Sequence, residues 1–257
     1  MNGIVKEVKM TTSSVVVAHE AIDGYMEAMT MEFQAENVGD LANLQPGDAI
    51  AFRLNVADRR GWIDQVKLVK AAAEQPYLVT NHSGADKAGT LRPGDLLTDC
   101  LLVDQDNSSF RLSDLRGYAL AVTFIFTRCP YPDFCPRMAQ NFRRVKEEFE
   151  EDPAVEKWKL LSVSIDPAYD TPDRLAAYAK ALGAPSERWL FATGDPGEIS
   201  SLSRAFGLNV MHDGKQLNHN LRTAVVDADG RLQKVFIGNA WSPAELAAEL
   251  RRAMAGR

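Results

Sequence analysis

Two cysteines, Cys129 and Cys135, stand where an apolar run gives way to a segment of helical spacing. The run 119–126 is rich in β-branched and aromatic side chains, which is typical of a strand buried on both faces. A helix is predicted next, from apolar residues at helical spacing: Met138, Phe142, Val145 and Phe149. The N-terminus of a helix offers unpaired N–H groups and a partial positive charge, which favour thiolate over thiol. The pair is therefore predicted to present reactive sulfur at a strand-to-helix turn.

A histidine from far downstream is predicted to join the two sulfurs. His219 stands just before residues 222–227, which are predicted to form the strand beside the central one. When these two strands are neighbours in the sheet, the loop that enters strand 222–227 faces the turn that carries the cysteines. Two thiolates and an imidazole are a soft donor set suited to copper or zinc. The sequence thus predicts a soft-metal site at Cys129, Cys135 and His219.

The same cysteines also suit thiol–disulfide exchange, and that alternative stays open. Redox enzymes with a thioredoxin-like fold, which presents reactive sulfur at such a strand-to-helix turn, usually carry two residues between their cysteines and a proline before the facing strand. Here five residues intervene, and Asn218-His219 occupies the neighbourhood of that proline, which favours metal. The two roles are compatible, because a copper-binding dithiol must be reduced to bind. The third cysteine, Cys100, is predicted to be a buried hydrophobic thiol.

A second soft constellation lies near the N-terminus. Met29 and Met31 are two positions apart, so in a strand they point to the same face and present two thioethers side by side. Packing in a core is the default explanation for such methionines. His19 and Met26 extend the set, however, and thioethers with imidazole select Cu(I) over Zn(II). These residues are therefore candidate ligands for Cu(I).

The strands and helices predicted around these residues form two domains joined by a linker. Residues 1–70 contain five short runs of strand periodicity, and so few strands predict a small closed all-β barrel because free edges are costly. Residues 71–92 have little apolar periodicity and much Gly, Ser and Asp, which indicates a linker. Residues 93–257 alternate between strand and helix and end in a hairpin and a helix, which predicts an α/β domain of thioredoxin type. Ser242 and Glu245 have capping-box spacing at the start of that last helix.

Charge and hydropathy exclude several classes of protein. The formal net charge of −6 argues against nucleic acid or an anionic membrane as the main partner. Apolar runs reach about eight residues, well short of the roughly 20 that span a bilayer, so no transmembrane segment is expected. The first residues lack both a basic region and an apolar region, so the sequence as given carries no secretory signal peptide.

From residue 92 to 255 the sequence resembles the Sco (SenC) family of copper-binding proteins, which assist cytochrome oxidase assembly. The resemblance rests on four motifs: TFIFTRCP at 123–130, Cys135-Pro136, SIDPAYDTP at 164–172, and His219 before TAVVD. It implies a thioredoxin-like fold that binds copper through Cys129, Cys135 and His219, with Asp166 as a candidate residue behind the ligands. The family's usual spacing puts three residues between the cysteines, whereas the loop here is longer by two.

Residues 1–70 resemble the CusF-type periplasmic copper-binding domain, a five-stranded barrel of OB type. The resemblance rests on His19, on Met29-Thr30-Met31 and on LQPGD at 44–48. It implies that His19, Met29 and Met31 are the copper ligands. That family also places a tryptophan over the copper, three residues before the first methionine. Met26 holds that position here, so either Met26 is a fourth ligand or the adjacent Tyr25 covers the ion.

Together the resemblances imply a copper chaperone in a periplasmic, extracytoplasmic location. The first domain would bind Cu(I), and the second would hold Cu(I) or Cu(II) for the copper-bearing subunit of a cytochrome oxidase or another copper acceptor. Two alternatives stay open. One is a thiol-disulfide oxidoreductase or thiol peroxidase that uses Cys129 and Cys135 with a thiol reductant protein as partner. The other is a buffer that stores copper without delivering it.

Overall fold

The computed structural model describes residues 1–21, 28–57, 60–71, 89–129, 131, 134–184, 187–213 and 216–255. The chain packs as two units, and each is described by itself. The first unit comprises Met1–Asp86, Met211–Asn220 and Ile237–Ala240. The second comprises Lys87–Val210, Leu221–Phe236 and Trp241–Arg257. Two segments of the first unit thus come from the C-terminal half of the sequence, and the contiguous boundaries given above stay a prediction.

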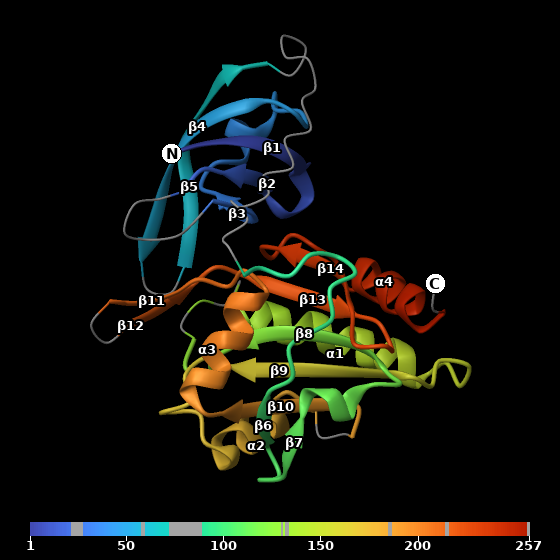
Figure 1. Ribbon diagram of the computed structural model, residues 1–257. Helices are drawn as coiled ribbons and strands as arrows, with labels where there is room; N and C mark the ends of the chain where they lie inside the picture. The colour runs from blue at the N-terminus through green and yellow to red at the C-terminus, as the bar shows by residue number, and fades with distance from the viewer. Residues whose placement is uncertain are drawn as a thin grey trace. The chain divides into compact units, whose positions relative to one another are not determined.

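The first unit is built on a closed barrel, in the strand order β1-β2-β3-β5-β4 (Figure 1). Its strands are β1 (Asn2–Lys9), β2 (Ser14–His19), β3 (Met29–Ala35), β4 (Ala49–Ala57) and β5 (Arg60–Lys70). Side chains alternate along β3 between buried and partly exposed positions, because successive residues of a strand point to opposite faces. The predicted five-stranded barrel is confirmed.

The second unit contains a seven-stranded sheet in the order β14-β13-β8-β9-β10-β6-β7. The strands are β6 (Leu101–Asp104), β7 (Ser109–Arg111), β8 (Ala119–Ile125), β9 (Trp158–Ser164), β10 (Trp189–Gly194), β13 (Arg222–Val226) and β14 (Leu232–Ile237). β9 runs parallel to both β8 and β10, and β13 is antiparallel to β8. All seven residues of β8 are buried, as its unbroken apolar run predicts. A short hairpin, β11 (Val210–Asp213) and β12 (Gln216–His219), lies outside this sheet.

Within the described residues, four helices cover the sheet: α1 (Cys135–Glu150), α2 (Pro172–Ala181), α3 (Pro196–Ala205) and α4 (Pro243–Ala255). α1 and α4 pack against each other and over β8, whereas α2 and α3 contact β10 (Figure 1). The predicted capping box starts α4, because the Ser242 hydroxyl accepts from Glu245 N at 3.2 Å and the Glu245 carboxylate accepts from Ser242 N at 2.7 Å. The predicted α/β domain is confirmed.

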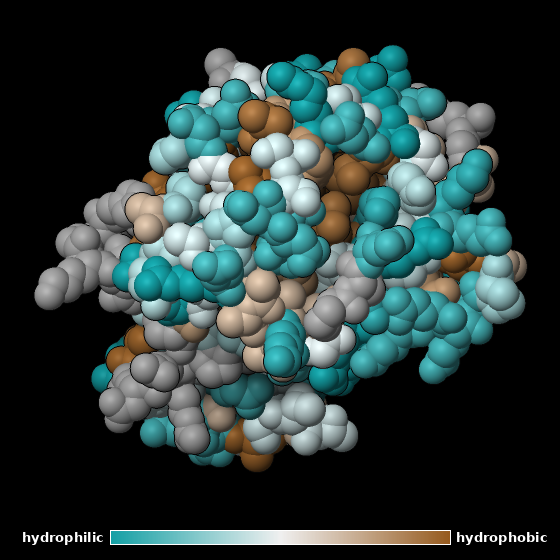
Figure 2. All heavy atoms as spheres, turned by 90° about the horizontal axis from the view of Figure 1, so that it is seen from below, coloured by the Kyte–Doolittle hydropathy of each residue, from teal (hydrophilic) through white to brown (hydrophobic). Residues whose placement is uncertain are grey.

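The surface carries scattered apolar side chains. On the face shown in Figure 2, hydrophilic residues predominate and hydrophobic ones lie among them. In the described part of the second unit, the large hydrophobic side chains that are exposed are Leu96 and Leu101. Single exposed residues of this kind are normal for a globular domain. None of the helices that the structure describes is both long enough and apolar enough to cross a membrane.

Candidate metal centres

The predicted barrel ligands share one buried face of the β2–β3 ladder. β2 and β3 are antiparallel, and His19 lies directly opposite Met29. Opposite residues of a ladder point to the same face, and Met31, two residues from Met29, shares that face. All three side chains are buried, with exposed fractions of 3, 5 and 6% for His19, Met29 and Met31. The structure therefore brings an imidazole and two thioethers together inside the barrel.

Hydrogen bonding fixes which nitrogen of His19 is available. Nδ1 lies 2.7 Å from the backbone oxygen of Glu20, and because a carbonyl can only accept, Nδ1 carries the proton. The lone pair is then on Nε2, which is buried and has no hydrogen-bond partner among the described residues. Burial lowers the pKa of His19, which keeps the ring neutral.

An unpaired buried acceptor costs about 1–3 kcal/mol, so the fold retains Nε2 of His19 at an energetic disadvantage. A soft cation removes that disadvantage, because a neutral imidazole and two thioethers are the donors it prefers. The residues present therefore fit copper. Met26 and Tyr25, the candidates for completing this site, lie outside the described residues.

The two cysteines meet where β8 turns into α1. Cys129 follows the end of β8, and Cys135 is the first residue of α1, with Pro136 in the first turn, where proline is favoured. Their side chains are hydrogen-bonded to each other, Cys129 being partly buried and Cys135 fully buried. The predicted placement of both sulfurs at a strand-to-helix turn is confirmed.

The two thiols differ in acidity. The hydrogen bond from Cys135 lowers the pKa of Cys129 to about 7, against the opposing effect of burial. Burial raises the pKa of Cys135, and hydrogen bonding to Cys129 raises it further. Cys129 is thus the thiolate of the pair and Cys135 the donor. Burial and the nearby charge of these sulfurs also raise the pKa of Tyr178 on α2, so its hydroxyl stays protonated.

Two carboxylates hold the turn that leads into Cys129. Asp170 is completely buried and accepts hydrogen bonds from Thr127 N at 3.0 Å, from Ser164 Oγ at 2.6 Å and from the Thr127 hydroxyl. Asp166 accepts from Arg128 Nε at 2.8 Å. Asp166 therefore binds the side chain of Arg128, the residue directly before Cys129. Sequence reasoning missed Asp170, although it stands within the SIDPAYDTP motif.

A stacked cluster beside Cys129 was also missed. The guanidinium carbons of Arg128 and Arg174 lie 4.4 and 3.8 Å from the centre of the Tyr169 ring. Arg174 also donates to the backbone oxygen of Tyr169 at 2.6 Å. Such contacts orient Arg128, and with it the chain entering the cysteine loop.

His219 makes the same kind of hydrogen bond through Nδ1 as His19. It is buried at the end of β12, and its Nδ1 donates to the backbone oxygen of Asn220 at 2.7 Å, which leaves the lone pair on Nε2. Burial lowers the pKa of His219 to about 4, so the ring is neutral and suited to a metal at neutral pH.

His219 belongs to the first unit and the cysteines to the second, so their convergence stays a prediction. Across the described ranges, no three His, Cys, Asp or Glu side chains form a metal-binding group. Cys100 is buried, so the prediction of a buried hydrophobic thiol is confirmed, and burial raises its pKa to about 11.

Comparison with known protein families gives one match for the N-terminal part of the chain and another for the C-terminal part. The family model for SCO1/SenC matches residues 89–255, more than half of the chain. This chain belongs to the SCO1/SenC family. The family model for the copper binding periplasmic protein CusF matches residues 1–68, so a CusF-like domain is fused to the Sco domain. Both predicted resemblances are confirmed.

Individual relatives cover the Sco domain. A putative copper-binding protein of Stutzerimonas stutzeri is 32% identical over 139 residues, which are 51% of this chain and 64% of that protein. A SCO1/SenC family lipoprotein of Bacillus anthracis is similar in structure, with a TM-score of 0.56 at 24% identity over 64% of this chain and 99% of its own. The copper-bound ScoI of Bradyrhizobium japonicum has a TM-score of 0.52 at 25% identity over 62% and 99%. The chain thus spans slightly less than two thirds of its Stutzerimonas relative, and the solved structures share the fold of the Sco domain.

The unequal acidity of the two thiols gives a pH-dependent prediction. In the reduced, metal-free protein, the rate of Cys129 alkylation by iodoacetamide should rise through a midpoint near pH 7, because the thiolate is the nucleophile. Cys135 should stay unmodified, because it is fully buried. Peptide mass spectrometry after timed labelling measures both. A midpoint near the ordinary thiol value of about 8.5 would contradict the assignment.

The buried carboxylate of Asp170 gives a stability prediction. Asp170→Ala should lower the free energy of unfolding by about 2–4 kcal/mol, because it leaves the Thr127 amide and two hydroxyls without their acceptor. Urea denaturation of the reduced protein measures the change. Asp173→Ala, at an exposed position in the first turn of α2, is the matched control and should cost less than about 1 kcal/mol. Equal losses in the two variants would refute the role given to Asp170.

Proposed function

We propose that this protein is a copper metallochaperone with two copper sites. The CusF-like barrel binds Cu(I) through His19, Met29 and Met31. The Sco domain holds copper through Cys129 and Cys135, with His219 as third ligand, for delivery to an acceptor. The observation that carries the proposal is the buried Nε2 of His19, which has no partner in the part of the chain that the structure describes and lies on the same face as two buried thioethers.

Charge argues that the barrel site takes Cu(I). An imidazole and two thioethers are all uncharged, so the ion's charge is not neutralised by its ligands. The cost of burying an ion grows with the square of its charge, which makes a monovalent ion far cheaper to hold there than a divalent one. Thioethers also prefer Cu(I) over Zn(II). The proposed cargo of the first site is therefore Cu(I).

The dithiol site supplies charge that the barrel site lacks. Cys129 is deprotonated near neutral pH, and a metal deprotonates its neighbour Cys135 by displacing the shared proton. Two thiolates neutralise either Cu(I) or Cu(II), so this site is proposed for both oxidation states. Because anionic ligands bind a cation more strongly than neutral ones, copper is expected to move from the barrel to the dithiol.

The acceptor is proposed from family membership. Sco proteins assist cytochrome oxidase assembly, so the proposed acceptor is the copper-bearing subunit of that enzyme or another copper protein. A periplasmic location is proposed because the family matched by the first 68 residues is named as periplasmic.

One observation favours a second candidate function. A thiol of lowered pKa hydrogen-bonded to a buried partner thiol is also the arrangement of a thiol–disulfide oxidoreductase. His219 separates the two functions, because an imidazole ligand is needed to hold copper but not to exchange a disulfide. A thiol reductant protein would be the partner in both cases.

Copper titration tests the proposal. The reduced full chain should bind one Cu(I) ion in each site, measured by competition with a chromophoric chelator and by metal analysis. The Met29→Leu/Met31→Leu variant should lose only the barrel ion, because leucine keeps the side-chain volume and removes the thioethers. Cys129→Ser should lose only the other ion. Unchanged stoichiometry in either variant would refute that site.

A second comparison separates chaperone from oxidoreductase. His219→Ala should weaken copper binding by the dithiol at least tenfold, since it removes one of three ligands, and should leave the barrel ion in place. Reduction of an insulin disulfide by the same variant measures the alternative. Retained copper affinity together with retained reductase activity would favour the enzyme over the chaperone.

A further inference from the structure

The strand that carries the two thioethers has one unpaired edge. β3 is paired with β2 from Met29 to Gln34 on one side. On its other side, β3 pairs with β5 only at Gln34 and Ala35. Within the described residues, the part of β3 that carries Met29 and Met31 therefore has no strand on that side. An open edge leaves backbone groups unpaired and the strand free to shift.

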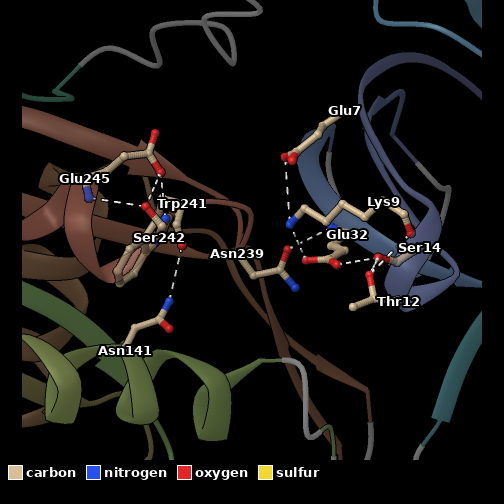
Figure 3. A network of polar contacts seen from close by, with 10 residues as sticks. All are labelled: Glu7, Lys9, Thr12, Ser14, Glu32, Asn141, Asn239, Trp241, Ser242 and Glu245. Carbon is tan, nitrogen blue, oxygen red and sulfur yellow. Dashed lines mark hydrogen bonds and ion pairs between the residues drawn. The ribbon is translucent and has the colours of Figure 1, made fainter.

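The segment Ile237–Ala240, which belongs to the same unit as the barrel, covers this edge. Oδ1 of Asn239 accepts a hydrogen bond from Glu32 N at 3.1 Å, and Figure 3 shows the amide pointing at β3. Asn239 is completely buried. Its position is thus built into the interior of the unit.

Gly238 also lies close to the strand. A Cβ at Gly238 would lie only 1.6 Å from the backbone oxygen of Thr30, the residue between the two methionines, so no side chain fits there. The backbone of Gly238 has a φ of +80°, which also favours glycine. Gly238 and Asn239 together form what we term the edge clamp.

The side chain of Glu32 is held as well. Its carboxylate accepts from Lys9 Nζ at 3.2 Å and from Ser14 Oγ at 2.6 Å, and Figure 3 shows this network on the barrel side. Glu32 is thus fixed by its backbone N–H through Asn239 and by its carboxylate through β1 and β2. Because Glu32 follows Met31 directly, these bonds fix the register that turns both thioethers inward.

The connection that carries the clamp is also bonded at its other end. The backbone oxygen of Trp241 accepts from Asn141 Nδ2 of α1 at 3.3 Å, and Ser242 caps α4. α1 is the helix that begins at Cys135.

We propose that the edge clamp, Gly238 and Asn239, positions the Met29-Thr30-Met31 strand for copper, so that Asn239 is a positioning residue of the barrel site. This inference rests on the proposed function of that site. Removing the clamp leaves the ligands in the chain but frees the open edge of β3, so copper must then order the strand that the clamp had ordered beforehand. Affinity falls while the stoichiometry stays the same.

Asn239→Ala in the full chain tests the clamp, in a Cys129→Ser/Cys135→Ser background that leaves only the barrel site. Competition between the protein and a chromophoric chelator for Cu(I) should show about tenfold weaker binding, the effect of one lost buried hydrogen bond. Ser203→Ala is the matched control, because it removes a buried hydroxyl on α3 whose partner is the Ser200 backbone oxygen. It should leave the affinity unchanged.

The outcomes separate the clamp from the site itself. If Asn239→Ala binds Cu(I) as tightly as its parent, the clamp is refuted and the site stands. If the Cys129→Ser/Cys135→Ser parent also fails to bind Cu(I), both the barrel site and the clamp are refuted. A loss of affinity equal to that of Ser203→Ala would mean general destabilisation and would also refute the clamp.

Hydrogen exchange of the unsubstituted protein provides a readout that does not depend on the folding of any variant. Addition of Cu(I) should slow amide exchange at Glu32 and across residues 237–242, because ordering of β3 and of the clamp are linked. Residues 196–205 of α3 are the internal reference and should not change. Copper-dependent protection of β3 without any change at 237–242 would overturn the proposal.

Discussion

A buried lone pair on His19 that has no hydrogen-bond partner among the described residues is the constraint on which the proposed barrel site depends. The fold directs the Nδ1 proton of His19 to a backbone carbonyl and leaves Nε2 facing the interior beside two thioethers. An apolar residue at position 19 would remove this cost. A bound ligand that accepts the lone pair of this nitrogen would offset the cost of burying it. Because none of these donors carries a charge, the ion it suits is monovalent and soft.

The second site depends on a different device, a strand end that must turn sharply into a helix. Two contacts fix this turn. The buried carboxylate of Asp170 accepts a hydrogen bond from Thr127 N, and the carboxylate of Asp166 pairs with Arg128. The sulfurs at the two ends of the turn are hydrogen-bonded to each other and differ in acidity. The longer loop between them is thus anchored at Thr127 and Arg128 on one side and by the start of α1 on the other.

Much of this architecture was predictable, because it depends on patterns among residues that are close in the sequence. The unbroken apolar run at 119–126 predicted the buried strand, and the i, i+2 spacing of Met29 and Met31 predicted a shared face. The capping box at Ser242 was equally local. What the sequence did not reveal depends on contacts between distant residues. Asp170 bonds to Thr127, 43 positions away, and Asn239 bonds to Glu32 across 207 positions, and neither hydropathy nor spacing encodes such pairs.

The most direct measurement of the central claim is copper K-edge X-ray absorption of the full chain carrying Cys129→Ser and Cys135→Ser, loaded with one equivalent of Cu(I). We predict an edge typical of Cu(I) and an inner shell with both sulfur and imidazole nitrogen, since thioethers are the sulfur donors that remain besides the buried thiol of Cys100. The sulfur contribution should vanish in the further variant Met29→Leu/Met31→Leu. A shell of nitrogen and oxygen alone before that substitution would contradict the account.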